Sequence, residues 1–458
     1  MSDPHAAPTP VAGSGGQPRR WQGWGRAIAS SGRHVIVADD AELERSVLAL
    51  PERGGIARGR GRSYGDQAQR GGGHALDLAP MQGIGPVAAD GTVVAEAGVT
   101  IHDLLRRCVP EGWFVPVTPG TRVVSVGGAV AADIHGKNHH RDGTFCSHIV
   151  WLDLVLSDGS TVRTGPDIEP ELFWATAGGL GLTGVVSRLC LRLVPIETSV
   201  VLVDTRRFDR LDHLLAAMIA ADATAPYSVA WVDCLGRRRG RSVLTTGRFA
   251  RSDEVDTPRR APGGRTVSVP PLGRHSLLRA STVTAFNAAW FRAAPRHRVA
   301  EPQSIARFFH PLDGVADWPR LYGGGGFCQW QFVVPDDAVE LVAAAIDELD
   351  AARVPTFLAV LKRFGPANPA PLSFPIAGWT LAVDIPARSA GVDAVLDRLD
   401  ARIAEAGGRV YLAKDARLDP RLVPAMYPGL DRWRAVRDRM DPHRRFVSDM
   451  AARLHLLG

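Results

Sequence analysis

The chain has 458 residues, 45% of them hydrophobic, and this length predicts two domains because a single core seldom grows past roughly 250 to 300 residues. Its 54 Lys and Arg residues against 48 Asp and Glu residues give a formal charge of +6, which favours contact with phosphates or an anionic membrane surface. The charge is spread thinly and no zinc-finger or RNA-binding signature occurs, which excludes a nucleic-acid-binding protein.

Residues 1–20 are rich in Ala, Pro, Gly and Ser, and are expected to form a disordered tail without a signal peptide. No segment reaches the roughly 18 consecutive apolar residues of a membrane-spanning helix, so membrane contact is expected to be peripheral. The cysteines are odd in number and form no C-x-x-C pair, which predicts buried free thiols rather than disulfides or a zinc site: Cys108, Cys146, Cys190, Cys234 and Cys328. No metal is expected.

The sequence predicts a first domain of the α+β class at residues 21–196, where many short strands are separated by glycine-rich turns. Thr100 is expected to cap a helix that runs through Cys108 and ends at Pro110. Further along, Asp158-Gly159 is typical of a tight turn between two antiparallel strands.

The sequence predicts a second domain at residues 197–412, with strands near 228–234, 326–335 and 378–386. Helices near 336–352 and 391–407 have spacings suited to packing on one sheet face. Segment 236–275 is crowded with Arg, Pro and Gly and is predicted to be a mobile loop. It could be a solvated basic excursion, or a lid or contact for phosphate or membrane. Residues 413–458 are expected to be helical and to return to the first domain.

The most informative feature is a set of four glycine-rich loops, at 57–67, 119–122, 125–129 and 177–186. Dense glycines allow positive φ angles and turn successive backbone N–H groups toward one point, which favours binding of a pyrophosphate. Ordinary tight turns are the alternative for any one loop. Four such loops in one half of the chain favour a long polyanionic ligand, such as a dinucleotide.

Three runs in this half, R-G-R-G-R-S-Y-G-D, V-G-G-A and E-L-F-W-A-T-A-G-G-L-G-L-T-G-V-V, resemble the FAD-binding domain of the vanillyl-alcohol-oxidase (PCMH) type. Within that superfamily, the resemblance is to the decaprenylphosphoryl-β-D-ribose 2-oxidase family. It rests on the runs at 133–140, 308–313, 371–376 and 411–415, and extends from about residue 21 to 457. The resemblance implies an α+β fold of two domains, with the substrate domain built on an antiparallel sheet flanked by helices.

The resemblance also implies FAD as the cofactor. Many members of the superfamily tether the flavin through a histidine of the first glycine loop, where this chain has Tyr64, so the FAD is expected to be non-covalent. The residues implied to line it are Ala57, Arg58, Gly59, Arg60, Gly61, Arg62, Ser63, Tyr64, Gly65, Asp66, Gln67, Gly120, Ser125, Val126, Gly127, Gly128, Ala132, Asp133, Ile134, His135, Val185 and Tyr411.

Oxidation of a secondary alcohol needs a proton acceptor and a cation near the reduced flavin ring. The catalytic candidates are Lys414, His135 and Tyr64. Lys414 could stabilise the anionic reduced flavin or orient the substrate, and the alternative is a salt bridge with Asp415. His135 could instead be a metal ligand or a core histidine.

On the substrate side, the resemblance points to Phe309, Gln331, Lys362, Phe364, Thr380 and Ala382. Lys137 belongs to a basic cluster at 135–141 that would suit a phosphate-bearing substrate or the flavin edge. Core packing is the alternative for the apolar members. Mycobacterial relatives carry Tyr, Asn and Cys where Phe309, Thr380 and Ala382 stand, so the pocket lacks a thiol and two polar contacts.

The family resemblance implies oxidation of the ribose 2-hydroxyl of decaprenylphosphoryl-β-D-ribose, the first half of an epimerisation to the arabinose sugar of cell-wall arabinan. It also implies an NADPH-dependent short-chain reductase as partner, and a location at the cell envelope, peripheral to the plasma membrane. An oxygen-dependent aldose or alditol oxidase and a flavin-binding paralogue without turnover are the alternatives.

Overall fold

The computed structural model describes residues 18–458, apart from 258, 264–265, 271–272, 274–275 and 390. Most of the predicted N-terminal tail, residues 1–17, lies outside the described residues. Arg19 and Arg20, at the end of that tail, instead belong to strand β1 (Arg19–Gln22) and pair with Gly32 and Ser31.

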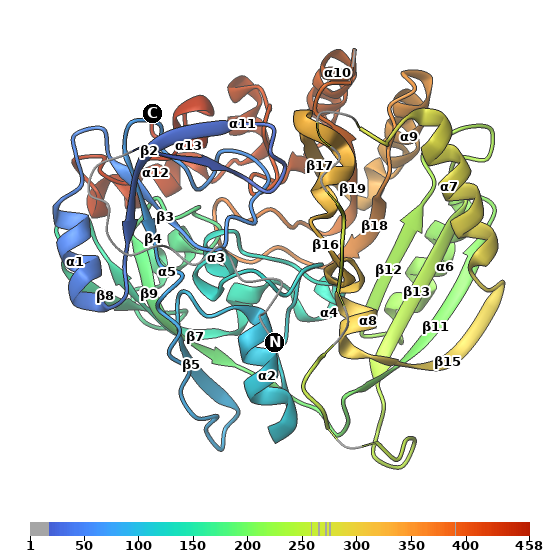
Figure 1. Ribbon diagram of the computed structural model, residues 1–458, viewed down its shortest axis with the longest axis horizontal. Coiled ribbons are helices and arrows are strands. Elements are labelled where there is room, and N and C mark those ends of the chain that lie inside the picture. Colours follow the sequence, from blue (N-terminus) through green and yellow to red (C-terminus); the bar gives the residue numbers. More distant parts are fainter. Residues whose placement is uncertain (1–17, 258, 264–265, 271–272, 274–275, 390) are drawn as a thin grey trace.

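The first domain contains two four-stranded sheets with helices around them (Figure 1). One sheet has the order β1-β2-β4-β3, with β2 (Ala29–Ile36), β3 (Gly55–Arg58) and β4 (His74–Asp77). The other has the order β5-β9-β7-β8, with β5 (Thr92–Glu96), β7 (Ile149–Val155), β8 (Thr161–Thr164) and β9 (Val185–Arg192). The helices are α1 (Asp40–Leu48), α2 (Ile101–Cys108), α3 (Val126–Ala131), α4 (His139–Asp142) and α5 (Pro170–Thr176).

Two local predictions for this domain are confirmed. The Thr100 side chain accepts a hydrogen bond from the Asp103 N–H at 3.1 Å, and the Asp103 carboxylate accepts one from the Thr100 N–H at 3.0 Å, so α2 begins with a capping box. Strands β7 and β8 pair antiparallel around the turn at Asp158-Gly159, and Gly159 takes a φ of +83° there.

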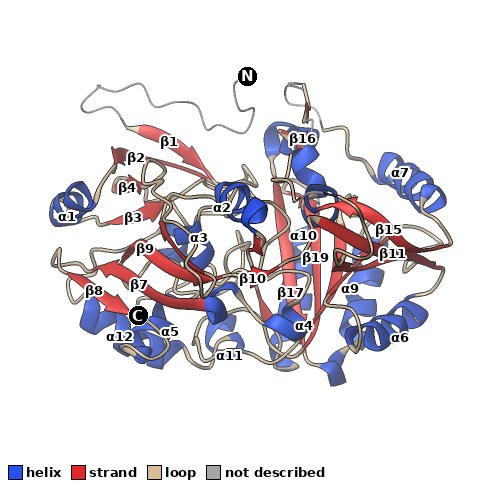
Figure 2. Ribbon diagram, turned by 90° about the horizontal axis from the view of Figure 1, so that it is seen from below, coloured by secondary structure: helices blue, strands red, loops and turns tan. Residues whose placement is uncertain are grey.

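The second domain is built on an eight-stranded antiparallel sheet in the order β15-β11-β13-β12-β18-β19-β17-β20. Figure 2 shows this sheet beside the sheets of the first domain. Its strands are β11 (Val200–Phe208), β12 (Tyr227–Val232), β13 (Ser242–Phe249), β15 (His297–Ser304), β17 (Phe327–Val334), β18 (Ala359–Phe364), β19 (Gly378–Pro386) and β20 (Arg409–Val410). The helices are α6 (Leu211–Asp222), α7 (Ala280–Ala293), α8 (Ile305–Phe309), α9 (Glu340–Ala351) and α10 (Val392–Glu405). The predicted strands near 228–234, 326–335 and 378–386 and both predicted helices are confirmed.

The two faces of β17 carry different side chains. On one face, Trp330 Nε1 donates to Asp400 of α10 at 2.8 Å, so this face packs against the helices. Gln331 points to the other face, as do its cross-strand partner Ala382 on β19 and, opposite Ala382, Val360 on β18. This second face carries the polar side chains of the site.

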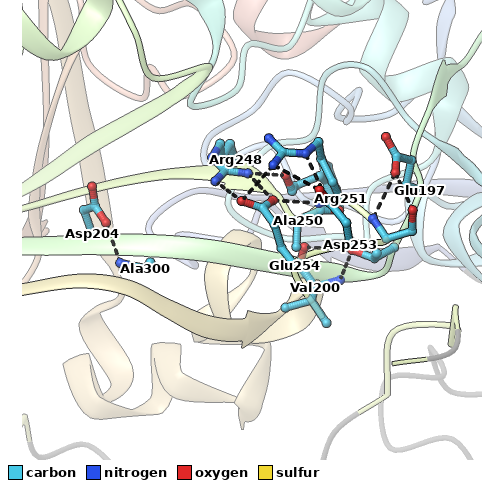
Figure 3. A network of polar contacts seen from close by, with 12 residues as sticks. Glu197, Val200, Asp204, Arg248, Ala250, Arg251, Asp253, Glu254 and Ala300 are labelled. Carbon is cyan, nitrogen blue, oxygen red and sulfur yellow. Dashed lines mark hydrogen bonds and ion pairs between the residues drawn. The ribbon is translucent and has the colours of Figure 1, made fainter. Parts of the chain in front are cut away.

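The predicted loop 236–275 is corrected in its first part, because Ser242–Phe249 forms the full-length strand β13 between β11 and β12. The alternating pattern of this strand is short and lies between arginine-rich runs, so the sequence around it indicated a loop. Beyond the strand, Glu254 binds the Arg248 guanidinium through both carboxylate oxygens, and Ser252 N–H donates to Glu197 at 2.9 Å (Figure 3). Residues 248–254 are therefore tied to the connection between the domains. Residues 258, 264–265, 271–272 and 274–275 of this segment lie outside the described ones.

The last segment contains α11 (Val423–Met426), α12 (Leu430–Met440) and α13 (Asp449–Arg453), and lies against the first domain. The Val447 N–H donates to the Gly55 carbonyl at 2.9 Å, and the Gly55 N–H donates to the Arg445 carbonyl at 2.9 Å. All five cysteines are buried free thiols, as predicted. None of the helices in the described ranges is long and apolar enough to cross a bilayer.

Candidate active site

The first glycine loop follows β3 and offers unpaired backbone donors. Within the described part of the chain, the N–H groups of residues 59–63 donate to no other protein group. Gly61 has a φ of +61°, and a Cβ on Gly59 would lie 2.1 Å from Ser125 Oγ. A side chain at position 59 would therefore displace Ser125, and the loop forms a concavity of N–H donors that suits a pyrophosphate.

The opposite wall comes from the loop before α3. Ser125 caps this helix by accepting from the Gly128 N–H at 3.4 Å. Gly120 and Gly128 are exposed, and a Cβ on Gly120 would meet nothing within 4 Å. Bare backbone thus faces open space here, opposite the first loop, which is the arrangement expected of a dinucleotide cradle.

Some residues expected to line FAD have side chains that bind protein groups instead. Arg58 donates to the carbonyls of Ala68 and Gln22, both at 2.9 Å, and Asp66 pairs with Arg453 at 2.8 Å. Val185 is buried in the core of the first domain. These residues contribute their backbone to the cradle, while their side chains hold the loops in place.

Gln67 connects the cradle to the segment that carries Lys414. Its amide donates to the carbonyls of Leu412 and Asp415 at 2.7 and 2.6 Å. Lys414 Nζ then lies 5.7 Å from the centre of the Tyr64 ring and 6.0 Å from that of Tyr411. The alternative pairing of Lys414 with Asp415 does not form, because Asp415 binds Arg453 at 2.8 Å.

His135 lies at the centre of the polar face. Its Nε2 atom is 3.1 Å from Gln331 Nε2, and its Nδ1 atom is 3.2 Å from Lys362 Nζ. Gln331 also donates to the Thr380 hydroxyl at 2.9 Å. Burial, together with the nearby charge of Lys414, holds the pKa of His135 well below its ordinary value of 6.5. His135 is thus a neutral imidazole in a polar network.

Aromatic rings enclose this network. The rings of Phe364 and Tyr411 lie with their centres 4.8 and 5.5 Å from that of His135, and the Tyr411 hydroxyl donates to the Ala132 carbonyl at 2.7 Å. Asp133, with a φ of +38°, accepts from Ser373 and Asn368 at 2.6 Å each. The loop 132–135 is thereby fixed between both domains.

Lys137 and Phe309 lie next to each other at a neighbouring position. Lys137 donates to the Phe308 carbonyl, and its Nζ atom lies 5.8 Å from the centre of the Phe309 ring. Burial lowers the pKa of Lys137 to about 7. Phe309 is buried against Phe114, Tyr227 and Phe249, so a large part of its surface is core packing.

Sequence reasoning missed Asp384, which is fully buried on the same face of β19 as Thr380 and Ala382. Gln329 donates to it at 2.5 Å. Burial raises the pKa of the Asp384 carboxyl, and burial lowers the pKa of the nearby Lys414 ammonium. The alternation in G-W-T-L-A-V-D-I-P was the available signal, because it places residues 380, 382 and 384 on one face.

The site therefore joins a backbone cradle to a buried cluster of one histidine and the lysines 362 and 414. Such a cluster stabilises negative charge and accepts protons, which are the needs of a flavin alcohol oxidation. In the described residues no three His, Cys, Asp or Glu side chains converge to hold a metal ion.

Comparison with known proteins agrees with this geometry. Residues 33–165 match the family described as an FAD binding domain, and residues 387–454 match D-arabinono-1,4-lactone oxidase. The chain is 38% identical over 454 residues to decaprenylphosphoryl-β-D-ribose oxidase of Mycolicibacterium smegmatis, which covers 96% of this chain and 98% of that protein. The chain belongs to the decaprenylphosphoryl-β-D-ribose oxidase family.

Other relatives share part of the chain. An uncharacterized protein of Streptomyces coelicolor is 40% identical over 78% of this chain and all of its own length. Cytokinin dehydrogenase 6 of Oryza sativa is 29% identical over 50% of this chain and 47% of its own.

As a member of the decaprenylphosphoryl-β-D-ribose oxidase family, the chain is an FAD-dependent oxidoreductase with the α+β fold of two domains. The residues present fit the cofactor, since positions 59–63 and 120–128 offer the cradle, and Gly59 leaves no room for a side chain. Tyr64, Tyr411 and Lys414 would lie at its flavin end.

Proposed function

We propose that this protein oxidises the ribose 2-hydroxyl of decaprenylphosphoryl-β-D-ribose to the 2-keto sugar, the first half of its epimerisation to the arabinose form. The observation that carries the proposal is the contact of His135 with Lys362 and Gln331 on the face that meets the dinucleotide cradle. The identity to the mycobacterial oxidase over nearly the whole chain supports this substrate.

The buried side chains have different roles in this reaction, which depend on whether they are neutral or charged. Bound FAD supplies a two-electron acceptor that takes hydride from the carbon bearing the hydroxyl group. Neutral His135 and Lys362 can take up the hydroxyl proton, since burial lowers the pKa of both. Lys414 offers positive charge beside the flavin end, held there by the Gln67 clamp. Lys137 offers a hydrogen-bond donor for the substrate phosphate, whose negative charge would favour the ammonium form of this lysine.

An anaerobic assay tests the proposal directly. The purified flavoprotein is mixed with a short-chain polyprenylphosphoryl ribose, and bleaching of the flavin absorbance is followed. We expect bleaching with this substrate and a rate lower by about 100-fold or more in Lys414→Met, with FAD still bound. Bleaching by free alditols but not by the phosphoryl ribose would contradict the proposal.

A second candidate is an oxygen-dependent oxidase of free sugars or lactones, which the match of residues 387–454 to D-arabinono-1,4-lactone oxidase favours. It predicts rapid hydrogen peroxide formation from aldoses, alditols or lactones in air. Slow peroxide formation with these compounds would leave the phosphoryl ribose as the substrate.

We also propose a partner and a location. A 2-keto sugar becomes the epimer only by reduction, so an NADPH-dependent short-chain reductase is the expected partner. A substrate with a polyprenyl tail resides in a membrane, so we propose that the protein acts at the cell envelope, peripheral to the plasma membrane. Co-purification with the reductase and membrane fractionation test these two points.

A further inference from the structure

One stretch of the sequence combines strong positive charge with exposed apolar side chains. Residues 257–300 contain eight arginines and no Asp or Glu, so this stretch alone exceeds the formal +6 of the whole protein. The rest of the chain mixes charges of both signs. A segment of this length without a single acid is unusual for a solvated protein surface.

Helix α7 lies within this stretch on the far side of the second domain from the FAD-binding half (Figure 1). One side of α7 is anchored, because Val283 and Phe291 are buried and Asn287 donates to Asp233 at 2.7 Å. The helix is therefore a fixed part of the fold, and its outward side is a permanent surface.

The outward side of α7 is apolar and aromatic. Phe286 and Trp290 are 45% and 51% exposed, and their rings stack with centres 6.3 Å apart. No charged residue occurs from 280 to 291, over three turns of the helix. The charges come at the ends, from Arg279 on one side and Arg292 on the other.

The apolar surface continues beyond the helix. Leu277 and Val299 are 54% and 61% exposed, and six of the ten exposed large hydrophobic residues of the described chain lie between 267 and 315. An apolar pocket of about 290 Å³ opens beside the helix, lined by Leu277, Leu278, Thr282, Val283, Phe286, Leu321 and Phe357. Clustering of this kind marks an interaction site rather than scattered surface residues.

We propose that the α7 surface, formed by Leu277, Phe286, Trp290, Val299 and the arginines at 279, 292, 296 and 298, docks the protein on an anionic bilayer. Helices that bind a membrane surface typically carry aromatic side chains at the depth of the lipid headgroups, with arginines around them. The inference rests on the proposed function, because a polyprenyl substrate requires a membrane-bound enzyme. The proposal also assigns the membrane contact that was considered for loop 236–275 to helix α7, which is a fixed part of the fold.

Charge decides between a bilayer and a protein partner. No Asp or Glu occurs from 277 to 300, and Glu301 is a carboxylate that binds one of the four arginines, Arg298, at 3.1 Å. The surface therefore keeps a net positive charge, which an anionic headgroup layer complements. A protein partner would need a matching acidic and aromatic face of the same extent. A second copy of this chain is not complementary, because two such arginine-rich surfaces repel each other.

The test is co-sedimentation of the full-length flavoprotein with vesicles of phosphatidylcholine, with and without phosphatidylglycerol. We expect binding to vesicles that contain phosphatidylglycerol, weakened by salt. The double variant Phe286→Ser/Trp290→Ser and the charge variant Arg292→Glu/Arg296→Glu should each lower this binding by about tenfold or more. The matched control is Leu48→Ser, because Leu48 is 48% exposed on α1 at the opposite end of the molecule (Figure 2), and it should bind as the wild type does.

Equal vesicle binding by the wild type and by both double variants would overturn the proposal. So would a wild-type dimer in vesicle-free solution that Phe286→Ser/Trp290→Ser converts to a monomer, because the surface would then join two copies. Flavin bleaching by a short-chain phosphoryl ribose, measured without vesicles, should be the same in wild type and variants. Absence of that bleaching in the wild type would count against the proposed function alone.

Discussion

His135 Nδ1 and Lys362 Nζ lie 3.2 Å apart, in a buried place where both cannot carry charge. In this amide orientation Gln331 donates to Nε2, so the proton of the neutral ring is on Nδ1 and points at Lys362. A lysine can accept that proton only as a neutral amine, and burial holds the pKa of Lys362 well below 10.5. Both lowered pKa values favour the neutral form of the pair.

Replacement of Lys362 tests this assignment. Arginine stays protonated, so Lys362→Arg should place an unpaired charge beside His135 and lower the rate of flavin reduction at least as much as Lys362→Met does. Stopped-flow bleaching measures both. If Lys362 served only to bind phosphate as a cation, Arg would retain most of the activity and Met would not.

Position 59 tests the cradle. A methyl group on Gly59 would lie 2.1 Å from Ser125 Oγ, so Gly59→Ala should weaken FAD binding by about 10- to 100-fold through overpacking of the loop. Titration of the apoprotein with FAD, followed by flavin fluorescence, measures the affinity.

The matched control for that variant adds Ser125→Ala, which removes the hydroxyl and leaves only the Ser125 Cβ, 3.2 Å from the added methyl. The double variant should regain affinity relative to Gly59→Ala. No recovery would mean that the added methyl displaces the cofactor itself rather than the loop.

The flavin link is testable by denaturation. Tyr64 stands where a tethering histidine would be required, so acid precipitation of the protein should release all the FAD into the supernatant. Absorbance of the supernatant at the flavin band measures the release. A yellow pellet after precipitation would contradict non-covalent binding.

His139 predicts a pH dependence of stability. Burial lowers its pKa from 6.5 to about 3, so between these values the unfolded chain binds a proton that the folded protein does not. Stability is then full above about pH 6.5 and falls by up to about 1.4 kcal/mol per pH unit below it. In His139→Asn, which keeps an acceptor for the Gly365 N–H, the free energy of unfolding by urea should fall less steeply between about pH 6.5 and 5. An unchanged slope would show that His139 is protonated in the folded state.

Replacement of two carboxylates of the second domain, Asp233 and Glu254, should lower the free energy of unfolding by very different amounts. Asp233 is fully buried and holds Arg241 at 2.6 Å and Asn287 at 2.7 Å, so Asp233→Ala should cost about 3 to 5 kcal/mol by leaving Arg241 unpaired. Glu254 pairs with an Arg248 that is 44% exposed, and Glu254→Ala should change stability far less. Urea unfolding of both variants decides this, and similar losses would contradict it.

The sequence predicted local features well where one short pattern decides them. Thr100 with Asp103, and the turn at Asp158-Gly159, need only neighbouring residues. Strand β13 was missed because its place in the middle of the sheet depends on β11 and β12, not on its own arginine-rich surroundings. A pattern read along the chain does not contain these long-range pairings.

The site shows the same limit. Motif resemblance pointed to His135, Gln331 and Lys362, and the structure brings these three together from two domains. Asp384 belongs to no quoted motif, and its closeness to Lys414 arises from the sheet and from the segment after β20. The roles of the site residues stay predictions until the variants are measured.

The bridge between Gly55 and Phe446 has a consequence for biogenesis. Strand β3, which leads directly into the first glycine loop, pairs with β4 on one side, and its contact on the other side, at Phe446, is made much later in the chain. During synthesis, the cofactor half therefore stays open on this side until residues 445–447 have been made. Chains truncated before residue 445 should therefore lack this edge of the cofactor cradle and accumulate without bound flavin.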